Sequence, residues 1–375
     1  MLHNHHSLWW RFFPKKKLNQ IYLSVMIRSF AISLISLFIP LYLYKEIGYT
    51  LNETLLFFIF YSIAFAVTTP LAAKFSARFG MKHSILFSIP FFLVFIILMY
   101  LLPTIHTPLF IIGFFLGAYV SFYWMGFHLV FYHDSDHKHR GEEYGKRASF
   151  SIIGTMLGPV IGGTLIEFFG FYSVFILSSV LLFVSAFFLF LSKDNHIRYH
   201  FSIKLLFDKK YWRNSLFFIS RGTYDIVAGV IWPLFIFFIL NDYLALGFIG
   251  SIFSGISAVL IWLMGKYSDH IEKRKIIRWI TGFESLSWLI RALVTTISQV
   301  FSITILGAVV YGIFETPIGA LEYDNAKRNV TPYFVSREIF ICLGRILLLC
   351  FVLITDSLTG GLIFHGFANL MALLF

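Results

Sequence analysis

Long apolar stretches alternate with short polar segments along almost the whole chain. Each stretch has about 20 residues, the length that an α-helix needs to cross the hydrocarbon core of a bilayer. The connecting segments are polar and mostly basic, as expected for loops in water. The pattern predicts twelve membrane-spanning helices, at residues 20–44, 51–73, 83–102, 107–132, 147–169, 171–192, 214–240, 244–265, 276–297, 299–321, 335–355 and 358–374.

Composition places the chain in a membrane. Apolar residues make up 58% of it and charged residues 13%, whereas soluble domains have about 45–50% and about 25%. So few charged residues cannot cover the surface of a soluble protein of this length. We therefore expect a multi-pass protein in the lipid bilayer of a cell membrane, which is the inner (cytoplasmic) membrane if the source is a bacterium or an archaeon.

The basic residues are divided unequally between the two sides of the predicted bundle. The side that carries the N-terminus has 25 Lys and Arg, the opposite loops have only Lys45, and four lie within spans. Because basic loops stay in the cytoplasm, both termini are predicted to be cytoplasmic. The net charge of +11 follows from this topology, so we expect no nucleic-acid partner.

Two segments reveal an internal repeat. Arg28 is followed twelve residues later by Pro40, and 193 residues further on Arg221 is followed at the same spacing by Pro233. In membrane transporters, such duplications supply two similar bundles that move around a shared binding site. Transport is therefore the leading hypothesis, and we expect the linker between the halves, with Asp194, to be solvated. The predicted regions are a cytoplasmic N-terminal segment at 1–19, an N-terminal six-helix bundle at 20–192, a cytoplasmic linker at 193–213 and a C-terminal six-helix bundle at 214–375.

A second echo lies in the loops after the second and eighth predicted spans, 192 residues apart. The first copy contains Arg78, Gly80 and a basic end, and the second contains Gly265, Asp269 and a basic pair. Each copy alone is a weak motif, but two copies in register at corresponding loops are a strong indication.

Two halves of six spans, both termini inside, a long middle loop and these loop motifs resemble the major facilitator superfamily, whose loop motif is G-x-x-x-D-R-x-G-R-[RK]. The resemblance implies an all-α polytopic membrane protein with twelve helices in two pseudo-symmetric six-helix bundles. In such a loop, an acid and arginines at a helix end bind a neighbouring helix end and lock one conformation. The first copy has Ala77 in place of the acid, so Asp269 is expected to carry the lock. The alternative is that these charges only set the topology.

The fifth predicted span contains Gly154, Gly158, Pro159, Gly162 and Gly163. Together they resemble the G-x-x-x-G-P-x-x-G-G signature of drug/proton antiporters in the superfamily. Gly154 and Gly158 share one helix face and let a neighbouring helix approach closely, and Pro159 bends the span. We expect this segment to pack near the interface between the halves, although small residues also pack helices in other membrane proteins. The resemblance favours efflux.

Ionisable residues inside spans are the best indicators of function, because each costs at least about 2.5–3.5 kcal/mol at mid-bilayer unless it faces a cavity or a partner. The resemblance implies a central cavity lined by spans one, four, seven and ten. These spans carry Arg28, His128, Arg221, Asp225 and Glu315, and span eleven adds Arg345. Glu284 and Arg291 share a face of span nine, which usually lies outside the cavity, so they are expected to be structural.

Asp225 and Glu315 are the predicted proton carriers. A carboxylate that alternates between a protonated state and an arginine-paired state couples proton movement to solute movement. Arg28, Arg221 and Arg345 are the predicted ion-pair partners or anion clamps. The alternative is a static ion pair between Arg221 and Asp225, four residues apart on one helix. Proton-coupled exporters of the superfamily often have an acid deep in the first six spans, and this chain has none there.

Aromatic residues crowd the fourth predicted span and recur in the seventh. Tyr123, Trp124 and Trp232 are predicted to form part of a cavity wall for an apolar or cationic ligand. The alternative is that they face lipid or pack within a bundle, because the chain is 20% aromatic throughout.

The sequence thus predicts a monomeric secondary active transporter that moves a small solute by alternating access. The leading version is proton-coupled export of an amphipathic compound. A sugar, organic-anion or peptide carrier of the same fold is the alternative within this class, and a transport-inactive membrane sensor or assembly partner is the alternative outside it. The chain has no Walker loop, nucleophile elbow or dinucleotide fingerprint, so we expect no enzyme activity and no cofactor. We also expect no metal site, since the His-rich loop at 133–140 lacks metal-ligand spacing.

Overall fold

The computed structural model describes residues 16–135, 140–190, 194, 196, 199, 201, 206, 212–267, 272–326 and 330–375. Within these residues the chain is helical and has no strand. Most of the N-terminal segment 1–19, most of the linker 193–213 and Asp269 lie outside the described residues. The helices are α1 (Lys16–Ser36), α2 (Ile39–Leu41), η3 (Tyr42–Glu46), α3 (Leu51–Phe79), α4 (Met81–Ile105), α5 (Leu109–Asp134), α6 (Arg140–Phe169), α7 (Phe171–Phe190), α8 (Trp212–Ile226), η6 (Val227–Ile231), α9 (Trp232–Leu240), α10 (Tyr243–Tyr267), α11 (Lys273–Arg291), α12 (Ile297–Asn325), α13 (Val330–Thr355), α14 (Leu358–Ala368) and η7 (Asn369–Leu374).

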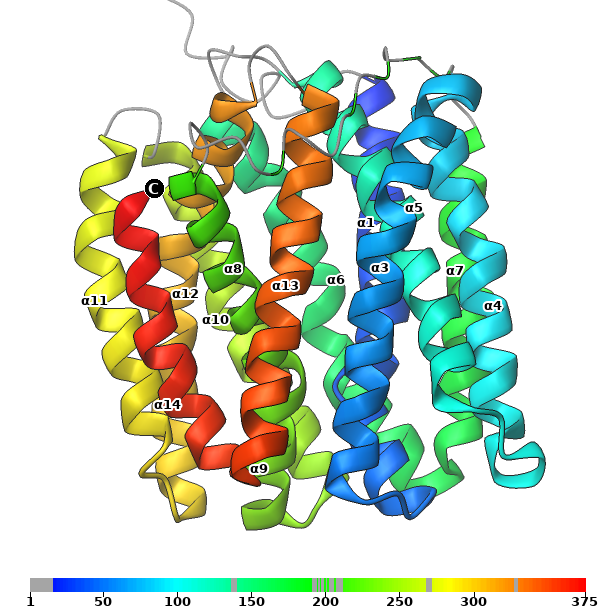
Figure 1. The fold of residues 1–375 in the computed structure, drawn as a ribbon, viewed down its shortest axis with the longest axis vertical. Coiled ribbons are helices and arrows are strands. Elements are labelled where there is room, and N and C mark those ends of the chain that lie inside the picture. Colours follow the sequence, from blue (N-terminus) through cyan, green and yellow to red (C-terminus); the bar gives the residue numbers. More distant parts are fainter. Residues whose placement is uncertain are drawn as a thin grey trace, which may run out of the picture.

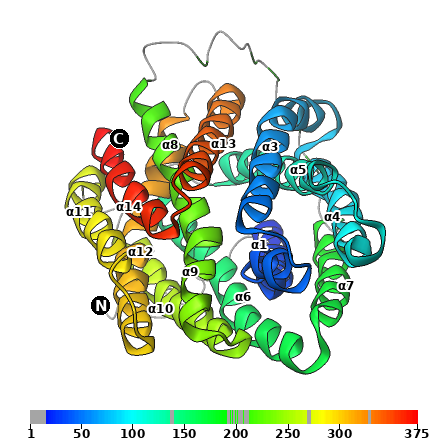
Figure 2. The ribbon, with the colours of Figure 1, turned by 60° about the horizontal axis from the view of Figure 1, so that its bottom comes forward.

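The long helices run roughly along one direction, so that their ends gather at two opposite ends of the molecule (Figure 1). The C-terminus lies at the top of Figure 1. We name this the inner end, because the distribution of basic residues predicts that it faces the cytoplasm, and the opposite end the outer end. Figure 2 shows α1 and α3 to α7 on one side of the molecule and α8 to α14 on the other. These two sets are the N-terminal bundle and the C-terminal bundle.

Nine of the helices in the described residues are long and apolar enough to cross a membrane. Two shorter apolar helices, Phe171–Phe187 and Leu358–Leu374, correspond to the predicted sixth and twelfth spans. The predicted ninth span corresponds to α11, which is not among the nine and starts with a strongly basic turn. The prediction of an all-helical, polytopic fold is confirmed, whereas the number of twelve spans and the orientation stay predictions.

The repeated prolines mark the same backbone irregularity in both bundles. α1 ends at Ser36, and Pro40 lies in the short α2, which continues into the π-helix η3. In the C-terminal bundle, α8 ends at Ile226, the π-helix η6 follows, and Pro233 lies at the start of α9. Proline lacks a backbone N–H and clashes with the carbonyl one turn earlier, and a π turn accommodates an interrupted hydrogen-bond ladder. The sequence echo therefore corresponds to a matching interruption in the first helix of each bundle.

Close helix packing is repeated as well. Gly154 of α6 lies against Met26 of α1, and Gly344 of α13 lies against Ile219 of α8. In both places a side chain would collide with the carbonyl oxygen of the facing residue. Met26 and Ile219 are 193 residues apart, the offset of the sequence repeat. Because small residues let membrane helices approach closely, the two bundles hold their first helix in the same way.

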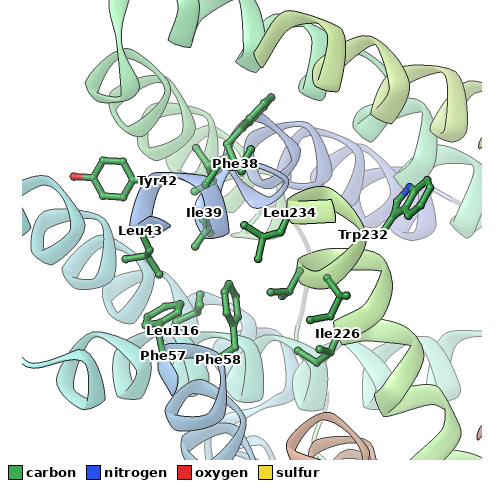
Figure 3. Close-up of a cluster of buried hydrophobic side chains, with 14 of the residues drawn as sticks. Phe38, Ile39, Tyr42, Leu43, Phe57, Phe58, Leu116, Ile226, Trp232 and Leu234 are labelled. Atoms are coloured by element: carbon green, nitrogen blue, oxygen red, sulfur yellow. The ribbon is translucent and has the colours of Figure 1, made fainter. Parts of the chain in front are cut away.

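An apolar cluster joins the two bundles near the outer end. Figure 3 shows Ile39 of α2 on one side of this cluster and Ile226 and Leu234 of α8 and α9 on the other. A polar contact adds to it, because the hydroxyl of Tyr243 on α10 donates a hydrogen bond of 2.8 Å to the carboxylate of Glu46. These contacts close the outer end of the interface between the bundles.

Candidate functional site

Two charged residues of α8 pair with two different helices of the C-terminal bundle. Arg221 and Asp225 lie four residues apart, so α8 presents both on one face. Nη2 of Arg221 lies 2.8 Å from the Glu315 carboxylate of α12, and Oδ2 of Asp225 lies 2.6 Å from Nη2 of Arg345 on α13. Because each residue bonds a partner on another helix, the static pair between Arg221 and Asp225 is not the arrangement found.

Both ion pairs also reach the N-terminal bundle. The hydroxyl of Tyr144 on α6 donates a hydrogen bond of 2.7 Å to Oε1 of Glu315. Arg345 donates a hydrogen bond of 2.8 Å to the hydroxyl of Tyr61 on α3 while its other nitrogen holds Asp225. Each carboxylate is thus connected to the opposite bundle, Glu315 directly and Asp225 through Arg345.

His128 of α5 forms a third link between the bundles. Its Nδ1 lies 2.6 Å from the hydroxyl of Tyr323 on α12, and its Nε2 lies 3.0 Å from the carboxylate of Glu338 on α13. A carboxylate only accepts hydrogen bonds, so Nε2 carries a hydrogen, and in the neutral ring Nδ1 accepts from Tyr323. Trp124 stacks on the imidazole with 5.3 Å between ring centres. The predicted cavity residues His128 and Trp124 therefore lie in a buried contact near the inner end.

Glu338 belongs to a charge cluster that joins α12 and α13. The Arg337 guanidinium lies 2.8 Å from the Glu322 carboxylate and also bonds Glu338. Both carboxylates are buried, with side chains 4% and 3% exposed. A single arginine thus compensates the charges of two buried carboxylates, at the place where His128 of the other bundle makes its contact.

Arg28 of α1 has aromatic neighbours in place of an acid. Its guanidinium lies 3.2 Å from the ring centre of Tyr123 and 5.4 Å from that of Tyr119. In the part of the chain that the structure describes, no carboxylate forms an ion pair with it, so the ring faces supply the main attraction. A void of about 10 Å³ beside it is lined, besides these three residues, by Ser24, Ile85, Ser88, Ile89, Leu182 and Ser185. Arg28 and Tyr123 therefore lie inside the N-terminal bundle.

A larger cavity, of about 90 Å³, lies on the C-terminal side of the interface between the bundles. Leu37 of the N-terminal bundle contributes to its wall, and the remaining lining residues belong to the C-terminal bundle. Trp232 lines it, whereas Tyr123 and Trp124 do not. Arg291 of α11 lines it too, although the sequence favoured a structural role outside the cavity. The lining residues are Leu37, Tyr224, Ala228, Trp232, Ile236, Leu246, Ile249, Gly250, Phe253, Trp288, Arg291 and Thr304.

Asp194, from the linker between the bundles, binds next to the first loop motif. Gly80 begins α4 with φ +113°, a conformation that glycine adopts readily. The carboxylate of Asp194 accepts hydrogen bonds of 3.0 and 3.1 Å from the backbone N–H groups of Lys82 and His83, where it complements the positive end of the helix. The expectation of a solvated Asp194 was wrong, because this side chain is 11% exposed and bonded. Arg78 of the same motif is exposed.

The fifth-span segment lies between α1 and the other bundle. Gly154, Gly158 and Gly162 lie against α1, where side chains would collide with its backbone or with a serine. Pro159 and Gly163 lie against α10 of the C-terminal bundle. The segment therefore packs on its own bundle with one face and on the interface with another.

The contact between α6 and α10 extends over the length of both helices. Towards the inner end Gly145 of α6 lies against Gly265 of α10, and towards the outer end Pro159 lies against Gly247. Gly265 of the second loop motif is thus a packing residue at the interface. Asp269, the acid of that motif, lies outside the described residues, so its locking role stays a prediction.

Several residues of these contacts were not identified from the sequence. Tyr61 and Tyr144 carry no charge and cannot be distinguished from the many other aromatic residues of the chain. Arg337 was counted among the basic residues that set the topology, and Glu322 and Glu338 lie close to predicted span ends. An acid beside a basic residue at the end of an apolar span was the available signal for Glu338.

Comparison with known proteins identifies one family. The sequence model of the Major Facilitator Superfamily matches residues 21–349. One relative, the uncharacterized protein YqgE of Bacillus subtilis (strain 168), is 26% identical over 276 residues, which are 68% of this chain. The match spans 63% of the Bacillus protein, less than two thirds of its length.

Solved transporter structures share the fold at low sequence identity. The human organic anion transporter MFSD10 (TETRAN) has a TM-score of 0.70 and 11% identity, with 96% of this chain and 100% of that chain covered. A bacterial homologue of the iron transporter ferroportin in an outward-facing state has a TM-score of 0.68 and 11% identity, with 96% and 97% covered. FucP in the outward conformation has a TM-score of 0.67 and 12% identity, with 95% and 97% covered. At these identities the likeness shows the fold alone.

Proposed function

This chain belongs to the major facilitator superfamily, and on that premise we propose that it exports a small amphipathic solute by alternating access, in exchange for protons. The family makes the chain a membrane transporter and not an enzyme. One observation carries the proposal of proton coupling. The two carboxylates Glu315 and Asp225 are each paired with an arginine, and each is connected to the opposite bundle.

Glu315 is the first proton carrier in this mechanism. As a carboxylate it accepts hydrogen bonds from Arg221 of its own bundle and from Tyr144 of the other. Hydrogen bonds to a charged group contribute about 1.5–3 kcal/mol, against about 0.5–1.5 kcal/mol between neutral groups. Protonation of Glu315 therefore weakens the attachment of α6 to α12, and the bundles separate more easily where this bond lies.

Asp225 is the second proton carrier and acts through its arginine. Arg345 is held between the Asp225 carboxylate and the Tyr61 hydroxyl. When Asp225 is protonated it no longer attracts the guanidinium by charge, so Arg345 is free to move relative to α8 and α3. This release loosens the contact between α13 and α3 of the opposite bundle, which links the proton to the movement of the bundles.

The direction of transport and the class of solute rest on separate observations. The fifth-span segment resembles the antiporter signature, and its glycines lie where α6 meets α1. The cavity between the bundles has mostly apolar walls with one cation, which suits an amphipathic molecule. A sugar, organic-anion or peptide carrier is the alternative, and the organic anion is favoured among these by Arg291.

Transport by purified protein in proteoliposomes tests the proposal. Compounds that raise the melting temperature of the protein are selected first, because a ligand of the folded state stabilises it. Their flux is then measured with and without an imposed pH gradient. We expect the gradient to accelerate flux at least about tenfold, and Asp225→Asn and Glu315→Gln each to abolish the acceleration while solute exchange without a gradient persists. The control is Asp242→Asn, since Asp242 is an exposed acid that caps α10 and asparagine caps helices equally well.

Two results contradict the proposal. If both variants keep gradient-driven flux, Asp225 and Glu315 are not the proton carriers. If stabilising compounds bind but none crosses the membrane in either direction, the protein is a sensor or an assembly partner instead of a transporter.

A further inference from the structure

Arg291, on the wall of the cavity between the bundles, is a buried cation without a bonded acid. It is 4% exposed, and its guanidinium lies 3.8 Å from the ring centre of Trp288 and 5.2 Å from that of Trp232. Among the described residues it forms neither an ion pair nor a hydrogen bond, and its Nε is buried without a partner. A guanidinium buried in this way is costly unless something compensates its charge.

Other arginines inside the C-terminal bundle are compensated differently. Arg221, Arg337 and Arg345 each form an ion pair of 2.8 Å or less with a carboxylate. Arg291 instead rests on two indole rings and on Gly307 of α12, where a side chain would collide with its Nη2. The absence of a side chain at Gly307 thus makes room for the guanidinium. These surroundings thus hold the guanidinium in place and leave its N–H groups available to a ligand.

Glu284 is the nearest acid on the same helix, two turns earlier. It is close enough for an electrostatic interaction with Arg291, and it is 3% exposed. However, Oε2 of Glu284 is itself buried without a hydrogen-bond partner, so the two side chains do not satisfy each other. Tyr224 and His365 are further groups near Arg291, and neither carries a negative charge at neutral pH. Arg221 and Glu315, which pair with each other, lie near Glu284.

The rest of the cavity wall is apolar apart from Thr304 and the hydroxyl of Tyr224. Leu37 comes from the N-terminal bundle and Phe253 from α10, so an occupant touches both bundles. A molecule that suits this site has one anionic group for the guanidinium and an apolar body for the remaining wall. Arginine binds a carboxylate with two parallel hydrogen bonds, and stacking on indole leaves the in-plane N–H groups free to do so.

We propose that Arg291, held by Trp232, Trp288 and Gly307, binds the anionic group of an amphipathic organic acid whose apolar part fills the cavity between the bundles. The inference rests on the proposed function, because it names the solute class that this cavity takes. A cavity of about 90 Å³ is smaller than the engineered cavity of about 150 Å³ that holds benzene. A one-ring acid therefore binds best when the cavity is slightly wider, so its binding selects a state with a wider cavity.

Three ligands with one benzene ring and different charges test this inference on the purified protein in detergent. Phenylacetate is an anion, 2-phenylethanol is neutral and 2-phenylethylamine is a cation. Their affinities are measured from the rise of the melting temperature with concentration. We expect phenylacetate to bind at least about tenfold more tightly than the alcohol, and the amine to bind most weakly. Equal affinity for the three, or preference for the amine, overturns the proposal.

Substitutions at the site separate an anion anchor from a structural arginine. Arg291→Gln should reduce phenylacetate affinity to that of the alcohol and leave the alcohol unchanged. Arg213→Gln is the matched control, because Arg213 also lies beside a tryptophan, 5.5 Å from the Trp212 ring, but at an exposed position. An unchanged phenylacetate affinity in Arg291→Gln, or the same loss in Arg213→Gln, overturns the proposal.

Glu284→Gln keeps the test conclusive if Arg291→Gln does not fold. Removing the competing acid should raise phenylacetate affinity about threefold or more, because the guanidinium then faces the ligand alone. If Arg291 serves only to neutralise Glu284, the variant leaves phenylacetate affinity unchanged, and the proposal fails.

The two proposals fail in distinguishable ways. Binding in detergent needs no gradient, so tight phenylacetate binding without flux in proteoliposomes contradicts transport and leaves the anion site intact. Proton-driven flux of another solute, combined with equal binding of the three ligands, contradicts the anion site and leaves transport intact.

Discussion

Arg28 and Arg221 occupy corresponding positions in the two bundles, yet their surroundings differ. Arg28 lies 3.2 Å from the ring centre of Tyr123, whereas Arg221 forms an ion pair of 2.8 Å with Glu315. Tyr123 lies on α5 and Glu315 on α12, so a tyrosine contacts the arginine in one bundle and a glutamate pairs with it in the other. The repeat preserves the position of the arginine and changes what compensates its charge.

This difference separates the tasks of the two bundles. An aromatic face attracts a guanidinium but cannot take up a proton near neutral pH, while a carboxylate can do both. The N-terminal bundle instead offers the hydroxyls of Tyr61 and Tyr144 and the imidazole of His128 to charged groups of the other bundle. In the proposed mechanism, the two carboxylates of the C-terminal bundle therefore carry the protons, and the N-terminal bundle contributes hydrogen-bond partners to them.

The largest expected effect comes from Arg221→Gln, which leaves the buried Glu315 without its cation. Removing one partner of a buried ion pair costs about 3–5 kcal/mol, so we expect a loss of that order in the free energy of unfolding, measured by chemical denaturation in mixed micelles. The double variant Arg221→Gln/Glu315→Gln should recover most of the loss. A fully stable single variant would mean that the ion pair is not what distinguishes the bundles.

Tyr144→Phe should have the next largest effect, because it removes the hydrogen bond that joins Glu315 to the other bundle. The loss is about 1.5–3 kcal/mol for a bond to a charged group. A double-mutant cycle with Glu315→Gln measures the coupling energy between Tyr144 and Glu315. A coupling energy close to zero would mean that Tyr144 acts through another residue.

Gly154→Ala and Gly344→Ala should destabilise the protein by similar amounts, since both force a methyl group against the backbone of the first helix in their bundle. Overpacking of this kind costs about 1–3 kcal/mol, measured by the same unfolding titration. A large loss for one substitution and none for the other would contradict the matching frameworks of the two bundles.

Arg28→Gln should have the smallest effect of the series. A cation–π contact contributes about 0.5–2 kcal/mol, depending on how far it is shielded from water. The free energy of unfolding should therefore fall less than in Arg221→Gln. In a protein that already carries Tyr123→Leu, adding Arg28→Gln should cost little more, because the main ring contact is gone. A loss as large as that of Arg221→Gln would point to an acid paired with Arg28.

Much of the framework could be predicted from the sequence, because it depends on local and periodic features. Apolar stretches of spanning length identified the long helices, and the echo of Pro40 by Pro233 located the interruption that the structure has in both bundles. The glycines of the fifth span predicted close packing with a neighbour. These signals need no knowledge of which helices are adjacent.

The partners of the charged residues could not be predicted in the same way. The sequence left open which arginine pairs with which acid, including a bond between Arg221 and Asp225 along α8, because the positions of α12 and α13 decide where the side chains reach. Arg147 and Arg337 were counted as topological charges, yet the structure buries Arg147 and covers most of Arg337 near the inner end. Charge counts cannot distinguish a loop residue from one that a neighbouring helix covers, since that depends on tertiary packing.

The paired glycines of α6 and α10 have a mechanical consequence. Where Gly145 meets Gly265, backbone faces backbone with no interlocked side chains, so the two helices can tilt or slide there without moving side chains past one another. The same holds at the opposite extreme of the seam, where Gly163 meets the main chain of Tyr243. Such a contact lets α6 and α10 change their mutual angle while part of their length stays packed, so the cost of opening either end is set by the side-chain contacts beside this seam.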